Sequence, residues 1–379
     1  MNIHTRHPQR RALLLVLELL CAIMCIPLRA QAAQFIYVVN EFSDNISAYS
    51  IDSNTGALEE IAGSPFATAR TPHYLALNPA GTFAYVVCDD AINGSLQSFA
   101  VDKTTGRLTL LVTVPLAPGS ALVPRVDPSG RFLLLASGRT GNVAVYSLDS
   151  ATGVGTLTNS LPLGGFAWSP PTVDPTAGYV YVAGWGNTVA ALRLTTGALS
   201  TVPSSPWRVR SVPKMPIKAP TALIPVVHPS GRYLYIADPV NRAIAAFSIA
   251  ADGSLTVLAN SPFRAQDIVA FDMTVEPKGK YLYLSDWDRG VVAGFAIADS
   301  GMLTPLPGSP FATPLKASDQ RSGGTALTIE SSGSFLYMTD TQANKISGFR
   351  IDSATGALHP LLGNPLATGK HPFRFAVSP

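Results

Sequence analysis

Short apolar segments rich in Tyr and Phe recur along the chain at intervals of about 50 residues. Aromatic and aliphatic side chains alternate within them, as in Tyr233–Ile236, and the 3.6-residue period of a helix is absent. The pattern therefore predicts one buried β-strand in each repeat. The seven segments are 35–39, 83–87, 132–135, 179–182, 233–236, 281–284 and 335–338.

Two kinds of turn flank these strands. A Pro-x-Gly turn such as Asp127–Gly130 precedes most of the later copies, and proline at the second position with glycine at the fourth favours a type I turn. A second turn follows each strand; it is Thr-Gly in most repeats, as in Thr55-Gly56, and Asp252-Gly253 and Ser300-Gly301 in the other two. Its Asp and Thr oxygens are expected to cap the turn. Each repeat is therefore predicted to contain four short antiparallel strands.

Seven four-stranded repeats predict an all-β fold, the seven-bladed β-propeller. The first repeat begins at Phe35 with its second strand and lacks a first strand of its own. The segment Phe373–Val377 at the end of the chain matches the first strand of a repeat. Pairing of the N-terminal strands with this C-terminal strand would close the ring and remove its free edges. We therefore expect residues 35–379 to form a single propeller domain.

The beginning of the chain has the layout of a secretory signal peptide. Arg10 and Arg11 precede the apolar run Ala12–Ile26, and Ala30–Ala32 supplies a small-x-small cleavage pattern. The apolar run is shorter than the ~20 residues that span a bilayer, although an uncleaved anchor is the alternative. We expect residues 1–32 to be removed, which gives a secreted or periplasmic protein with no membrane span in the mature chain.

Removal of this leader changes the charge and the cysteine content. The chain has 27 Lys+Arg and 24 Asp+Glu, and the leader holds four Arg and one Glu. The mature part is then close to neutral, which gives no reason to expect nucleic acid as a partner. Cys88 is the one cysteine left, so no internal disulfide is expected, and its apolar setting predicts an inert buried thiol.

The repeats resemble those of the YVTN-type, lactonase-like seven-bladed propellers, whose cytosolic enzymes hydrolyse 6-phosphogluconolactone. The matching phrases are Tyr37–Asn40, Asn78–Val86 and Ile351–Leu358. The resemblance covers essentially residues 35–379 and implies the propeller fold together with a lactonase activity. The enzymes carry an Arg-His pair after a proline; the nearest segments here, Thr71–Tyr74 and Lys370–Arg374, lack that adjacency.

Alignment of the predicted innermost strands gives one candidate constellation. Asp272 and Arg374 are charged exceptions at a mostly apolar level, and Arg125 lies one step deeper. Charges near the axis need a partner or a task. Asp272 is a candidate general base, Arg374 a candidate for orienting substrate, and His73 a neighbouring candidate. A water-filled channel with scattered charges is the alternative, and contact between Asp272 and Arg374 across one intervening blade stays open.

The connections between blades supply further candidates. The loop from Ser200 to Pro220 is long and contains basic side chains without acidic ones, so it could bind an anionic group. Its candidate ligand-binding residues are Trp207, Arg208, Arg210 and Lys214. A solvated loop whose charges only confer solubility is the alternative.

Three acidic residues follow the aromatic strands at matching positions, namely Asp238, Asp286 and Asp340. An acidic arc near the channel mouth could bind a cation as its ligand. Since Asn40 occupies the same position in another blade, capping of the local turn is the alternative.

Together these features predict a secreted, lactonase-like propeller that binds a small-molecule or carbohydrate-like ligand, or an envelope protein. The alternative is a hydrolase that opens a sugar lactone, a carboxylic ester hydrolase with a rearranged site. Whether the protein is an enzyme is left open at this stage. We expect a monomer without a cofactor. We also expect no metal site, because the histidines of the mature chain are scattered along the sequence.

Overall fold

The aromatic segments form the second strand of each sheet in a computed structural model of the chain. The structure describes residues 33–89, 94–116, 122–138, 140–164, 169–176, 178–184, 187–209, 223–287, 289–314 and 324–379. Within it, Ala33–Pro379 forms one compact unit. The expected signal peptide, 1–32, lies outside the described residues, as do Arg210 and Lys214.

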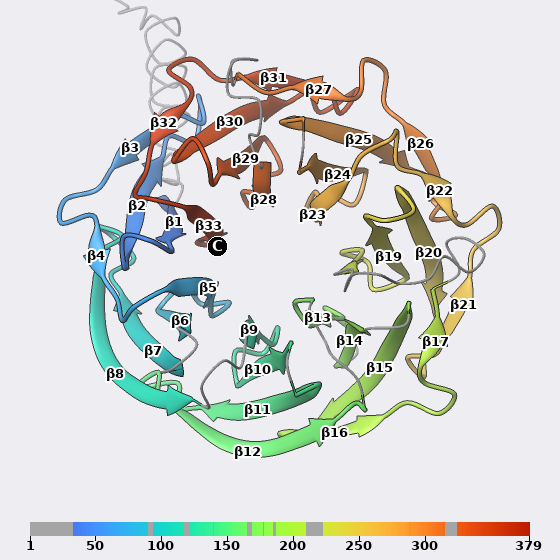
Figure 1. Cartoon of the computed structure of the whole chain (residues 1–379), viewed down its shortest axis with the longest axis horizontal. Coiled ribbons are helices and arrows are strands. Elements are labelled where there is room, and N and C mark those ends of the chain that lie inside the picture. Colours follow the sequence, from blue (N-terminus) through green and yellow to red (C-terminus); the bar gives the residue numbers. More distant parts are fainter. Residues whose placement is uncertain are drawn as a thin grey trace, which may run out of the picture. The chain divides into compact units, whose positions relative to one another are not determined.

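Seven antiparallel sheets surround a central axis, as predicted (Figure 1). The innermost strands are β5 (Pro72–Leu77), β9 (Leu122–Val126), β13 (Thr172–Val173), β18 (Ile224–Val227), β23 (Ala270–Val275), β28 (Gly324–Ile329) and β33 (Pro372–Val377). The second strands are β1 (Gln34–Asn40), β6 (Phe83–Asp89), β10 (Phe132–Ser137), β14 (Tyr179–Gly184), β19 (Tyr233–Asp238), β24 (Tyr281–Asp286) and β29 (Phe335–Asp340).

The outer half of each blade is less uniform than the inner half. The third strands are β2 (Asn45–Ile51), β7 (Gly94–Val101), β11 (Asn142–Leu148), β15 (Thr188–Thr195), β20 (Ala243–Ile249), β25 (Val291–Ile297) and β30 (Lys345–Ile351). The outermost are β3 (Leu58–Glu60), β8 (Leu108–Leu116), β12 (Gly155–Pro162), β16 (Ala198–Thr201), β21 (Leu255–Val257), β26 (Leu303–Pro305) and β31 (Leu358–Pro360). Five blades add a short outer piece: β4 (Phe66–Ala67), β17 (Trp207–Arg208), β22 (Phe263–Arg264), β27 (Phe311–Ala312) and β32 (Leu366–Ala367).

The split outer strand was not predicted, and a proline explains it. In the blade of β20, Ser261-Pro262 interrupts the outer strand between β21 and β22. Proline has no N–H to donate to a strand ladder. The Ser261 hydroxyl instead accepts a hydrogen bond from the Ala246 amide at 2.9 Å, so the third strand keeps its partner.

The ring closes between the two ends of the chain, and this prediction is confirmed. β1 pairs antiparallel with β33, with Ile36 opposite Val377 and Val39 opposite Arg374. The Phe35 and Ser378 backbones add a further hydrogen bond of 2.8 Å. The closing blade therefore has no free inner edge.

Tyrosines of the second strands join neighbouring blades. In five of them, a fully buried tyrosine donates its hydroxyl to the carbonyl of the Thr-Gly-type turn of the next blade. These pairs are Tyr37–Gly106, Tyr181–Gly253, Tyr235–Gly301, Tyr283–Gly356 and Tyr337–Gly56. The glycine is required there: its φ is positive, and a Cβ at Gly301 would lie 2.6 Å from the Tyr233 ring. The repeated aromatic segment thus fixes each blade against the next.

This arrangement predicts the effect of removing one hydroxyl. Tyr235→Phe leaves the Gly301 carbonyl buried without its donor, and should lower the free energy of unfolding by about 1–3 kcal/mol. Urea denaturation with an unchanged m-value would measure this loss. Tyr146→Phe is the matched control, because the Tyr146 hydroxyl has no hydrogen-bond partner among the described residues. Equal losses for the two variants would contradict the prediction.

Candidate functional site

Three innermost strands carry the candidate side chains, and each has a β-bulge at the same level. The pairing shifts between Pro72 and Tyr74 in β5, and between Ala270 and Asp272 in β23. In β33 the shift lies beside Phe373. A bulge inserts one residue without a cross-strand partner and redirects the side chains around it. The inserted residues at the three sites are His73, Phe271 and Phe373.

Asp272 and Arg374 are in contact, which settles the question that the sequence left open. Arg374 Nη1 lies 3.3 Å from Asp272 Oδ2, and the two side chains are 15% and 18% exposed. The same Oδ2 accepts a hydrogen bond from the Leu327 amide of β28, the strand between them, at 3.0 Å. Oδ1 accepts one from the Met273 amide. Asp272 therefore ties three neighbouring innermost strands together and fixes the position of the guanidinium.

Burial and nearby charges shift the pKa values of Asp272 and Arg125 in opposite directions. Burial raises the pKa of Asp272, while Arg374, the backbone amides and Arg125 pull it down. Arg125 has the reverse balance: desolvation by the surrounding protein lowers its pKa and Asp272 raises it. Arg125 remains open to water within the channel, and its Nε donates to the Pro171 carbonyl at 3.3 Å. The structure thus brings Arg125 within electrostatic reach of Asp272.

Aromatic rings surround the Arg374 guanidinium. Its carbon lies 4.6 Å from the ring centroid of Phe271, 5.3 Å from that of Phe373 and 5.7 Å from that of Tyr74. Such contacts are favourable for a cation that is partly withdrawn from water. Burial raises the pKa of Tyr74, so its hydroxyl stays protonated at neutral pH. The result is an apolar wall with one oriented cation set in it.

The sequence analysis missed a second cluster, centred on Glu41. Glu41 Oε1 lies 2.8 Å from Nε2 of His73, in a hydrogen bond. Oε2 lies 2.7 Å from Nδ1 of His371, within ion-pair distance. Burial raises the pKa of Glu41, but the contacts with His371 and His73 outweigh it and bring the pKa to about 2. Glu41 is therefore ionised at neutral pH.

Phe373 links the two clusters. Its ring centroid is 5.7 Å from that of His73 and 6.0 Å from that of His371. Because the same ring packs against Arg374, the imidazoles and the guanidinium share one end of the channel. His371 and Thr71 occupy matching places, each directly before the proline that begins an innermost strand, and both have a left-handed backbone with φ 56°. No local signal pointed to Glu41, which lies in the turn after β1.

The long loop expected over 200–220 is partly a strand, which corrects that prediction. β16 includes Ser200 and Thr201, and β17 pairs Trp207 with Val189 of β15. Trp207 packs half-buried against the core of its blade, whereas Arg208 is exposed on this outer strand. Neither side chain lies at the channel with His73 and Arg374. Arg210 and Lys214 fall outside the described residues, and ligand binding by this segment remains a prediction.

The three matching acidic residues are buried beneath their turns. Asp238, Asp286 and Asp340 are at most 1% exposed. Asp286 accepts hydrogen bonds from the Arg289 backbone amide at 2.7 Å and from its guanidinium. Asp238 and Asp340 accept backbone amides of their own turns in the same way. This geometry agrees with the turn-capping alternative.

The described residues were compared with two further kinds of structure, metal sites and membrane-spanning helices. They contain no group of three or more His, Cys, Asp or Glu side chains arranged to bind a metal ion. Nor do they contain a helix long and apolar enough to cross a membrane.

Comparison with known proteins supports the fold and identifies the family. Solved structures with the same fold include a candidate 6-phosphogluconolactonase of Bacteroides fragilis, with 19% identity and a TM-score of 0.76 over 93% of this chain and 100% of that one. Another is the periplasmic gluconolactonase of Pseudomonas aeruginosa, with 18% identity and a TM-score of 0.70 over 92% and 99%. No curated protein sequence matches significantly. The model of the family described as "Lactonase, 7-bladed beta-propeller" matches residues 62–361, and the chain therefore belongs to that family.

Proposed function

We propose that the protein is a hydrolase that opens a sugar lactone at the channel mouth. The observation that carries this proposal is the pairing of a carboxylate-bound imidazole with an oriented guanidinium at one aromatic-lined site. The imidazole can accept and then donate a proton. The guanidinium can bind the oxygen on which negative charge develops. Both groups would accelerate the hydrolysis of an ester by water.

His73 is the base in this mechanism. Since Glu41 is ionised, its Oε1 accepts a hydrogen bond from the Nε2–H group of His73, which leaves Nδ1 of His73 unprotonated and able to accept a proton. Nδ1 removes a proton from water as the water oxygen bonds to the lactone carbonyl carbon. Arg374 stabilises the carbonyl oxygen. The bond to the ring oxygen then breaks, the proton passes to that oxygen, and the product is an open hydroxy acid.

Asp272 acts through Arg374 in this scheme. Both of its oxygens already accept hydrogen bonds, from Met273 and Leu327, and one also contacts the guanidinium. These contacts favour a positioning role over the general-base role considered from the sequence. The aromatic wall offers the sugar ring a flat apolar surface on which to pack.

The comparisons favour the hydrolase over a protein that only binds an envelope partner. The family is named for lactonases, and both structural relatives described above carry lactonase names. One relative is periplasmic, which is compatible with the leader-like N-terminus of this chain. Export of the protein is part of this proposal.

Replacement of Arg374 tests the proposal directly. Arg374→Gln removes the oriented cation, and kcat/KM for a δ-lactone of a sugar should fall about 10²–10³-fold in a pH-indicator assay corrected for spontaneous hydrolysis. Arg193→Gln, at an exposed position of β15, is the control and should keep full activity. Wild-type rates that do not exceed the spontaneous rate would overturn the proposed function.

The Glu41 cluster predicts how stability depends on pH. The pKa of Glu41 is lower in the folded protein than in the unfolded chain, so its stabilisation is fully present above pH 4.5 and is lost as the pH falls toward about 2. We expect Glu41→Gln to remove on the order of 2 kcal/mol of this pH-dependent stability, measured by urea unfolding at pH 5 and pH 2.5. A variant with the wild-type pH dependence would show that the two histidines do not hold this carboxylate.

A further inference from the structure

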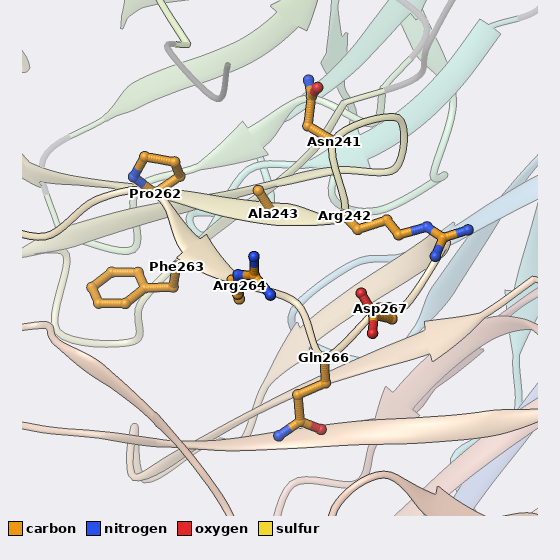
Figure 2. Close-up of a pocket in the computed structure, with 8 residues that line it drawn as sticks. All are labelled: Asn241, Arg242, Ala243, Pro262, Phe263, Arg264, Gln266 and Asp267. Carbon is orange, nitrogen blue, oxygen red and sulfur yellow. The ribbon is translucent and has the colours of Figure 1, made fainter.

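A concave pocket of about 320 Å3 lies away from the channel cluster, in the blade formed by β18–β22. The turn between β19 and β20 forms one side, and β22 with the connection to β23 forms the other (Figure 2). Its lining residues are Asn241, Arg242, Ala243, Pro262, Phe263, Arg264, Gln266 and Asp267. None of them takes part in the proposed hydrolysis.

Arg242 is unusual when its blade is compared with the others. Its carbonyl accepts a hydrogen bond from Ala265 at 2.9 Å, and the same bond marks the equivalent residue in five other blades. All six residues have a left-handed backbone, with φ between 48° and 67°. The five equivalents are Asp44, Gly141, Asn187, Gly290 and Asn344.

Arginine is a costly choice at this position. Glycine, asparagine and aspartate tolerate a left-handed conformation, whereas other residues lose about 1–2 kcal/mol there. Five blades keep one of the three tolerant residues, and this blade alone of the six carries a long cationic side chain. A residue retained in an unfavourable conformation points to a role other than folding.

A second arginine lines the same pocket from the facing strand. Arg264 of β22 lies opposite Ala243, the residue after Arg242. Three of the four equivalent positions in other blades hold alanine, namely Ala67, Ala312 and Ala367. Both arginines are exposed, and neither forms an ion pair with a described carboxylate.

The other lining residues indicate which chemical groups a ligand of this pocket would carry. Phe263 is half-buried and Pro262 exposed, which provides an apolar surface for a sugar ring. Gln266 Oε1 accepts a hydrogen bond from Ser309, which leaves the Gln266 amide hydrogens as donors. Asp267 supplies an acceptor for hydroxyl groups and would repel a highly charged anion. The pocket as a whole carries one net positive charge.

We propose that this pocket binds the carboxylate of an acidic sugar, such as a uronate residue of an oligosaccharide. The two guanidinium groups would hold the carboxylate, since planar guanidinium and carboxylate groups form paired hydrogen bonds. The apolar surface, Gln266 and Asp267 would hold the ring and its hydroxyls. The pocket is thus a carbohydrate site separate from the channel.

Titration calorimetry of the full protein with oligogalacturonate, and with a neutral oligosaccharide of equal length, tests the proposal. Wild-type protein should bind the acidic oligomer at least tenfold more tightly. Arg242→Asn and Arg264→Ala each install the residue that other blades use, so both variants should fold. Each should weaken binding of the acidic oligomer about tenfold or more, while Arg242→Asn should keep or raise the melting temperature.

Arg193→Ala is the control, because Arg193 is an exposed arginine on β15, in another blade, and does not line the pocket. It should leave binding unchanged. Equal affinity for the acidic and neutral oligomers, or wild-type affinity in both pocket variants, would overturn the proposal. Lactone hydrolysis should be unaffected in Arg242→Asn, so this test and that of the proposed function can fail independently.

Discussion

The pairing of β1 with β33 is the interaction on which the rest of the structure depends. It joins the first and last strands of the described chain and closes the ring of seven sheets. It also brings Glu41, in the turn after β1, against His371, just before β33. Arg374 lies within β33 itself. The candidate site is therefore a product of ring closure and could not form in an open array of blades.

The same closure accounts for how rigidly the site is held. In five of the seven blades a buried tyrosine hydroxyl fixes the blade to the turn of the next, which limits movement of the innermost strands relative to one another. Asp272 adds a polar link across β23, β28 and β33. A guanidinium held by such links is already oriented before a substrate arrives, which is the condition for effective electrostatic stabilisation.

Internal repetition helps to separate structural residues from functional ones in this protein. Where the blades agree, as at the left-handed turn position held by Asn187 and Asn344, the residue is explained by backbone geometry. Where one blade departs, as at Arg242, geometry alone gives no reason for the side chain. The same reasoning applies to the bulged positions, where His73 stands in one blade and phenylalanine in two others. The proposed binding and catalytic roles include residues at positions where one blade differs from the others, such as Arg242 and His73.

The sequence by itself determined the fold, because strand alternation, turn residues and repeat number are local signals that all favour one architecture. It also placed Asp272 and Arg374 at one level near the axis, since a common turn aligns the innermost strands. Only the tertiary structure decided that these two side chains touch, that Glu41 holds two histidines, and that Trp207 and Arg208 lie on an outer strand. Those contacts join residues far apart in the chain, and their geometry is set by ring closure, by β-bulges and by a proline break. The proline itself is visible in the sequence, but ring closure and the contacts that it creates are not encoded in any short stretch of it.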